Sequence, residues 1–114
     1  MPELPEVETV RQSLKLRLIG RKIISCEVYH DNIIEYPSVL EFKKNIINQS
    51  FLDIERYGKW LVFVLNEYYL LSHLRMEGKY FFRNKGEKLY KHEHVVFGLD
   101  NGLEFRYMDV RKFG

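Results

Sequence analysis

Apolar residues in the first twenty positions recur at helical spacing. They fall three or four positions apart, at Val7, Val10, Leu14 and Leu18, and so line one face of an α-helix. Pro5 suits the first turn of such a helix, and Gly20 suits its C-terminal end. The pattern predicts a helix between these two residues, with Glu6 and Glu8 in the first turn, where the helix dipole favours anions.

A second, shorter helix is predicted after Ser38. Glu41 follows that serine by three residues, which is the spacing of a capping box. Val39, Phe42 and Ile46 then recur at helical spacing. The pattern therefore places one apolar face on a short helix that begins near residue 39.

Most of the remaining chain favours strands. These segments are short, rich in Val, Ile, Phe and Tyr, and separated by turn residues. They span 22–30, 51–57, 60–65, 68–75, 79–83, 94–99 and 103–108. Between the last two, Asp100-Asn101-Gly102 is typical of a tight hairpin, because Asn and Gly tolerate positive φ.

This order of elements predicts a mainly β, α+β fold: a two-sheet antiparallel β-sandwich flanked by two helices. The 114 residues are 46% apolar and suffice for a single domain with one core. Cys26 is the one cysteine, which excludes an internal disulfide and a cysteine-rich metal site. It lies in an apolar alternation and is expected to be buried. No apolar run is long enough to cross a bilayer and no signal peptide is evident, so we expect a cytoplasmic protein.

Charge adds little by its sum, because 18 basic residues nearly balance 16 acidic ones and leave a net charge of +2. Its distribution is more informative. Basic residues gather toward the C-terminal part, at Arg75, Lys79, Arg83, Lys85, Lys88, Lys91, Arg106, Arg111 and Lys112. Such a cluster is consistent either with an ordinary solvated face or with a surface that contacts nucleic acid.

The N-terminus carries candidate chemistry. Removal of Met1 would leave Pro2 as a free secondary amine, and an N-terminal amine titrates near about 8. Its neutral fraction can attack a sugar or carbonyl carbon and form an iminium, while Glu3 or Glu6 protonates the reacting sugar. The structural alternative is that Pro2 and Pro5 only stiffen the approach to the helix.

The run Met-Pro-Glu-Leu-Pro-Glu-Val-Glu-Thr at residues 1–9 resembles the signature of formamidopyrimidine-DNA glycosylases. Leu4 favours the branch of that family that repairs oxidised purines over the branch with Gly at this place. The resemblance continues, in the family's order, at 57–60, 73–78, 91–95 and 106–114.

The resemblance implies a bifunctional enzyme of base-excision repair that acts on damaged double-stranded DNA. Pro2 would attack C1′ of the damaged nucleotide, and β- and δ-elimination would then cut the backbone. Glu3 would donate a proton to the opening sugar, and Lys59 would transfer protons during β-elimination. Glu6 is either a second carboxylate that tunes Glu3 or an ordinary first-turn residue.

Flipping a base out of a duplex leaves a gap that the protein has to fill. The resemblance assigns this task to Met76, Arg111 and Phe113, whose alternative is core packing for the two apolar residues. Met76 is expected in an exposed turn at a strand end. His73 and His92 match residues that contact phosphates.

His92 and His94 would face one way if both lay on a strand, but no third ligand is evident. We therefore expect no metal site in the chain, and we expect His94 to be structural.

In the resembled family, Phe113-Gly114 is followed by a helix-two-turns-helix unit and a zinc finger with four cysteines. Residues 1–114 are therefore expected to be the N-terminal catalytic domain alone, with the one structural zinc in the C-terminal part. DNA binding by this domain alone should be weak and salt-sensitive, with impaired excision. A monomer is expected.

Two other functions remain open. A tautomerase that uses an N-terminal proline as general base would account for Pro2 but not for Glu3, Lys59 or the segment 111–113. A non-catalytic DNA-binding module would keep the fold and the DNA-contacting face without turnover. Trapping residue 2 on abasic DNA distinguishes the enzyme from the module.

Overall fold

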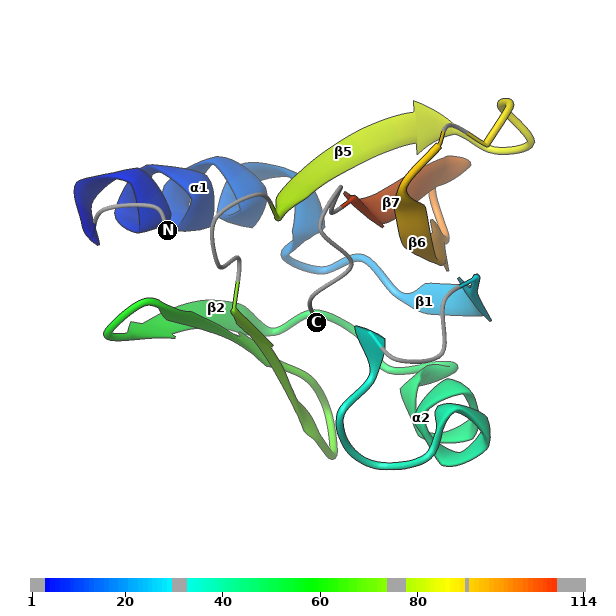
Figure 1. Ribbon diagram of the computed structural model, residues 1–114, viewed down its shortest axis with the longest axis horizontal. Helices are drawn as coiled ribbons and strands as arrows, with labels where there is room; N and C mark the ends of the chain where they lie inside the picture. The colour runs from blue at the N-terminus through cyan, green and yellow to red at the C-terminus, as the bar shows by residue number, and fades with distance from the viewer. Residues whose placement is uncertain (1–3, 30–32, 74–77, 90, 109–114) are drawn as a thin grey trace.

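The computed structural model describes residues 4–29, 33–73, 78–89 and 91–108. These ranges contain both predicted helices and all seven predicted strands (Figure 1). In chain order the elements are α1 (Leu4–Leu18), β1 (Ile23–Val28), α2 (Val39–Ile46), β2 (Asp53–Tyr57), β3 (Trp60–Val64), β4 (Tyr69–His73), β5 (Lys79–Asn84), β6 (Glu93–Leu99) and β7 (Leu103–Met108).

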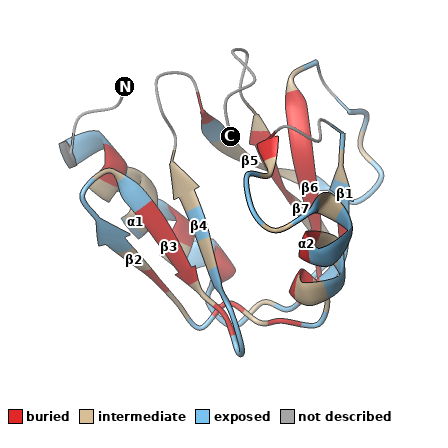
Figure 2. Ribbon diagram, turned by 60° about the horizontal axis from the view of Figure 1, so that its bottom comes forward, coloured by how far each residue is buried: buried red, intermediate tan, exposed pale blue. Residues whose placement is uncertain are grey.

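The strands form two antiparallel sheets that face each other. One sheet has the order β1-β6-β7-β5, and the other has the order β2-β3-β4. Figure 2 shows them as two layers, with buried residues concentrated on β3, β6 and β7. The predicted fold class, a mainly β sandwich with two helices, is confirmed.

Helix α1 packs its predicted apolar face against β2 and β3. Val7, Leu14 and Leu18 are almost fully buried. The helix ends before Gly20, whose φ of 86° lies in the left-handed region that glycine adopts without a Cβ clash. The Gly20 amide leaves the helix and donates to the Phe51 carbonyl oxygen at 2.8 Å. This bond ties the end of α1 to the segment that leads into β2.

Helix α2 packs against β1 of the other sheet. Its predicted cap is present, because the Glu41 amide donates to Ser38 Oγ at 3.2 Å. Phe42 and Ile46 are buried, and the Phe42 ring lies 6.2 Å from that of Phe97 on β6. The short helix therefore covers one edge of the sandwich.

The core between the sheets centres on Phe105 of β7, which has no exposed surface. Its ring centroid lies 5.9 Å from that of Phe63 on β3 and 5.8 Å from that of Phe97 on β6. Tyr80 of β5 stacks on it at 4.7 Å. Aromatic pairs at these separations add to the stabilisation from buried area. Phe105 thus joins the two sheets.

The hairpin between β6 and β7 forms at the predicted turn. Gly102 has a φ of 83°, and the Leu103 amide donates to the Asn101 side-chain oxygen at 3.2 Å. Cys26 is 3% exposed, as predicted, and burial raises the pKa of its thiol to about 12. In the described ranges, no helix combines the length and the apolar character needed to cross a membrane.

Replacing Phe105 by alanine should lower the free energy of unfolding by about 3–5 kcal/mol, because it would leave a cavity and remove contacts with both sheets. Tyr69→Ala is the matched control, since that ring lies on a strand but is 70% exposed, and it should cost less than about 1 kcal/mol. Urea denaturation followed by tryptophan fluorescence measures both. Equal losses would show that Phe105 does not hold the sheets together.

Candidate functional site

The second turn of α1 and the turn between β2 and β3 are joined by one arginine. Arg56 Nε donates to Glu8 Oε1 on α1 at 3.0 Å. Its Nη1 donates to the Gly58 carbonyl oxygen in the turn, also at 3.0 Å. Lys59, the next residue, is therefore held near the N-terminal part of the helix that follows Pro2 in the chain.

Glu8 is the centre of this contact. It accepts hydrogen bonds from Arg11 Nε at 3.0 Å and Nη2 at 2.8 Å, and from Gln12 Nε2 at 2.9 Å. The Arg11 bonds, followed by those of Gln12 and Arg56, lower the pKa of the Glu8 carboxyl to about 2. The prediction that Glu8 lies in the first helical turn was wrong. The helix starts at Leu4, which puts Glu8 in the second turn, facing β2.

Arg11 makes a further link between helix and sheet. Its Nη1 donates to the Ile54 carbonyl oxygen of β2 at 2.8 Å, while its other nitrogens bind Glu8. The hydrogen bonds to Glu8 raise the pKa of Arg11. A forked guanidinium can make these bonds together, which a lysine cannot.

Lys59 lies in the turn, and β3 begins at Trp60, the first residue of the strand predicted at 60–65. The turn places Gly58 at a φ of 59°, which ends β2 and reverses the chain. Lys59 is partly exposed. Its position in a turn lets the side chain reach solvent or a bound molecule.

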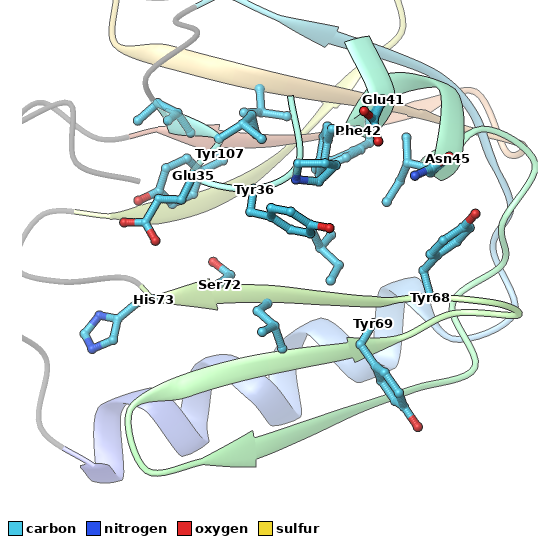
Figure 3. Close-up of a pocket in the computed structure, with 18 of the residues that line it drawn as sticks. Glu35, Tyr36, Glu41, Phe42, Asn45, Tyr68, Tyr69, Ser72, His73 and Tyr107 are labelled. Carbon is cyan, nitrogen blue, oxygen red and sulfur yellow. The ribbon is translucent and has the colours of Figure 1, made fainter. Parts of the chain in front are cut away.

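His73 lies at the same end of the three-stranded sheet as Lys59. It pairs with Trp60 across β3 and β4, and the two rings meet edge to face at 5.0 Å. Figure 3 places His73 at the end of β4. The structure therefore brings two of the predicted residues, Lys59 and His73, to the same end of the three-stranded sheet.

A cavity of about 600 Å³ opens between β4, α2 and the inner face of the larger sheet. Figure 3 shows Tyr36 and Phe42 on one side of it and Ser72 on the other. Ser72 and Tyr80 share a hydrogen bond across the two sheets. Most of the lining is apolar or aromatic, so the cavity suits an apolar group better than a phosphate.

His92 belongs to the loop that enters β6. Its φ of 71° is in the left-handed region, so it lies outside the strand that starts at Glu93. His92 and His94 therefore do not share a strand face, in agreement with the predicted strand 94–99, and their rings are 6.4 Å apart. His94 is buried, at 5% exposed. Across the described ranges no three His, Cys, Asp or Glu residues gather closely enough to hold a metal ion.

A buried arginine anchors this loop. Arg106 of β7 is only 2% exposed, and its Nη1 donates to Glu93 Oε1 at 2.8 Å and to the Lys88 carbonyl oxygen at 3.0 Å. Its Nη2 donates to the Glu87 carbonyl oxygen at 2.7 Å. Arg106 was grouped by sequence with the basic residues of a candidate surface; the structure corrects this, because its charge is internal and positions the loop.

Several other basic residues are exposed around the same sheet. Arg83 of β5 is partly exposed and lies 3.5 Å from Glu87. The exposed lysines there are Lys79, Lys85, Lys88 and Lys91. Three of these lysines lie in the loop that Arg106 anchors.

Five predicted site residues lie outside the described residues: Pro2, Glu3, Met76, Arg111 and Phe113.

Glu6 is described, and it is exposed in the first turn of α1.

Sequence reasoning missed Glu8, Arg56 and Arg106 as residues that arrange the site. A weak signal existed for Glu8, because Arg11 follows it by three residues on a helix. No local signal identified the bond from Arg56 to Glu8 or the bond from Arg106 to Glu93, whose partners are 48 and 13 residues apart in the chain.

Residues 1–114 match the sequence model of the formamidopyrimidine-DNA glycosylase N-terminal domain. The chain is 49% identical to the formamidopyrimidine-DNA glycosylase of Oceanobacillus iheyensis and 47% identical to that of Bacillus subtilis. Each match covers 100% of this chain, and 41% and 42% of those relatives, respectively. The chain thus spans less than half the length of these curated relatives.

Solved structures show the same architecture. A complex of the Lactococcus lactis Fpg with DNA containing an abasic site aligns with a TM-score of 0.93 and 39% identity, over 98% of this chain and 42% of that one. Its complex with DNA containing FAPY-dG aligns with a TM-score of 0.92 and 39% identity, over 97% and 42%. A complex of the wild-type protein with DNA containing an oxidised pyrimidine has a TM-score of 0.93 at 40% identity, over 98% and 42%.

Arg106→Met should lower the free energy of unfolding by about 3–5 kcal/mol, because it leaves the Glu93 carboxylate buried without this partner. Arg21→Met is the control: its side chain is 41% exposed and pairs with Asp100 at 3.6 Å, so it should cost less than about 1 kcal/mol. Thermal denaturation compares them. The double variant Arg106→Met/Glu93→Leu should recover stability; failure to recover would mean that the pair is not the source of the loss.

The low pKa of Glu8 predicts that the free energy of unfolding depends on pH in the acid range. A carboxylate whose pKa falls from 4.5 to about 2 on folding stabilises the fold fully above 4.5 and loses that contribution as the pH drops toward 2. The difference in unfolding free energy between wild type and Glu8→Gln should therefore be constant at neutral pH and shrink below pH 4.5. Urea denaturation at several pH values measures it, with Glu55→Gln as a charge-matched control. A difference that does not change in acid would contradict the assignment.

Proposed function

The chain belongs to the formamidopyrimidine-DNA glycosylase family, and we propose that the protein carrying it excises oxidised purines from DNA and cuts the resulting abasic site. The observation that carries the proposal is the match over residues 1–114, which includes the N-terminal run from Pro2 onward. Support comes from the structural relatives solved with abasic and FAPY-dG DNA. The preference for purines rests on Leu4.

In the proposed reaction, the Pro2 nitrogen bonds to C1′ of the damaged nucleotide as the glycosidic bond breaks. A secondary amine at a processed N-terminus is partly neutral near pH 7, because its pKa is about 8. Glu3 protonates the sugar as its ring opens, and the product is an iminium between Pro2 and the sugar. Glu6, exposed on the first turn of α1, supplies negative charge near this end of the helix.

Lys59 is proposed to move protons during β-elimination, after the iminium has formed. Its place in the β2–β3 turn supports this role, because the turn is bonded through Arg56 to the helix that follows Pro2. A lysine ammonium in such a turn can also pair with a backbone phosphate. Successive β- and δ-elimination would then cut the DNA on both sides of the lost base.

The proposed DNA contacts come from the ends of two strands, one in each sheet. His73 is the last residue of β4 and His92 directly precedes β6, and both are partly exposed. Exposed lysines in the loop before His92 add positive charge for phosphates. Met76, Arg111 and Phe113 are proposed to fill the gap left by the flipped nucleotide.

Borohydride trapping tests the nucleophile. The full natural-length protein, with Met1 removed, is incubated with DNA containing an abasic site and reduced, and the adduct is mapped by mass spectrometry. We expect a covalent adduct on Pro2, since reduction converts the iminium into a stable amine. A form that retains Met1 is the control and should give no adduct, because its Pro2 nitrogen is an amide.

The result distinguishes the alternatives. An adduct on a lysine, with Pro2 free, would contradict the mechanism. DNA binding without any adduct would favour a non-catalytic module. The tautomerase alternative does not account for the family match over residues 1–114.

A further inference from the structure

We infer that Glu8 and Arg56 are a positioning pair that sets the place of Lys59 relative to the N-terminal end of α1. The inference rests on the proposed function, in which Pro2 and Lys59 act on the same sugar. Neither Glu8 nor Arg56 needs to touch the substrate for this role.

The contacts of Arg56 reach both elements at once. One nitrogen binds the Glu8 carboxylate on α1 and another binds the Gly58 carbonyl oxygen, each at 3.0 Å. Lys59 is bonded directly to Gly58 in the chain, so its backbone moves with that carbonyl. Arg11 adds a second link, from Glu8 to the Ile54 carbonyl oxygen on β2.

The turn is closed by the pairing of Tyr57 with Trp60, and the bond from Arg56 ties its Gly58 carbonyl toward α1. A Cβ built at Gly58 would have no heavy atom within 4 Å, so no side chain of the described residues, apart from its chain neighbours, packs at that position. The bond from Arg56 is directional and depends on the forked guanidinium. Its loss should therefore let the turn shift.

The contact between Glu8 and Arg56 by itself contributes modestly to stability, because Arg11 and Gln12 are larger causes of the lowered pKa of Glu8. The side chains of Glu8 and Arg56 are 36% and 32% exposed, and ion pairs at such sites contribute modestly. The catalytic rate is more sensitive to this geometry than the stability is, because misplacement of a reacting group by about 1 Å can cost about a hundredfold in rate. The main consequence of the pair is thus geometric.

The test is a double-mutant cycle in the full natural-length protein. Single-turnover cleavage of abasic DNA is measured for wild type, Glu8→Gln, Lys59→Met and the double variant. Binding to DNA with a non-cleavable tetrahydrofuran abasic analogue is measured in parallel. We expect Glu8→Gln to slow cleavage by about tenfold or more while the Kd changes by less than about threefold.

The cycle identifies the residue through which Glu8 acts. In the Lys59→Met background, Glu8→Gln should cost less than about twofold, because coupled residues are not additive. An equal loss in both backgrounds would overturn the inference and leave the proposed function intact. A wild-type protein that does not cleave abasic DNA would overturn both.

Arg56→Lys and Arg56→Gln separate geometry from charge. A lysine keeps the positive charge but cannot bind Glu8 and Gly58 together, so both variants should slow cleavage alike. Cleavage by Arg56→Lys at the wild-type rate would mean that only the charge matters and would also overturn the inference. Glu55→Gln is the control for a neutralised carboxylate on β2 and should cleave as wild type does. Amide exchange at Trp60, which pairs with Tyr57 across the turn, should speed up in Glu8→Gln; unchanged exchange would contradict the inference without any assay of activity.

Discussion

The packing of Phe105 between the two sheets is the interaction on which the rest of the structure depends. Its ring contacts Phe63 of the three-stranded sheet and Phe97 and Tyr80 of the four-stranded sheet. A sheet with one apolar face has to bury that face against another layer. The relative placement of β4, which ends at His73, and of β6, which follows His92, is set by this contact between layers.

Two arginine networks at the margins of this core hold the segments that carry candidate chemistry. Arg56 joins the β2–β3 turn to α1 through Glu8, in a partly exposed setting where geometry is the main outcome. Arg106 instead binds Glu93 and the carbonyl oxygens of Glu87 and Lys88 inside the protein, where an unpaired charge would be costly. In both networks a guanidinium binds a carboxylate and a backbone carbonyl, so it places a loop and not only a side chain.

The local pattern of apolar and capping residues was sufficient to predict the helices and strands. The spacing of Val7, Leu14 and Leu18 identified the buried face of α1, and Ser38 identified the start of α2, because both signals act within a few residues. The residues of the candidate site could be predicted from the sequence only in part. Lys59 and His73 were recognised through a family resemblance, while the buried role of Arg106 was missed, since an arginine on an alternating strand does not reveal which face it occupies.

The sequence alone therefore determined the helices, the strands, the hairpin at Gly102 and the family to which the chain belongs, since each depends on neighbouring residues or on ordered motifs. Only the tertiary structure decided which charged side chains form ion pairs. Glu8 and Arg56 are 48 residues apart, and their contact exists because α1 packs on β2. Long-range ion pairs follow from the packing of apolar faces, which brings distant side chains within hydrogen-bonding distance.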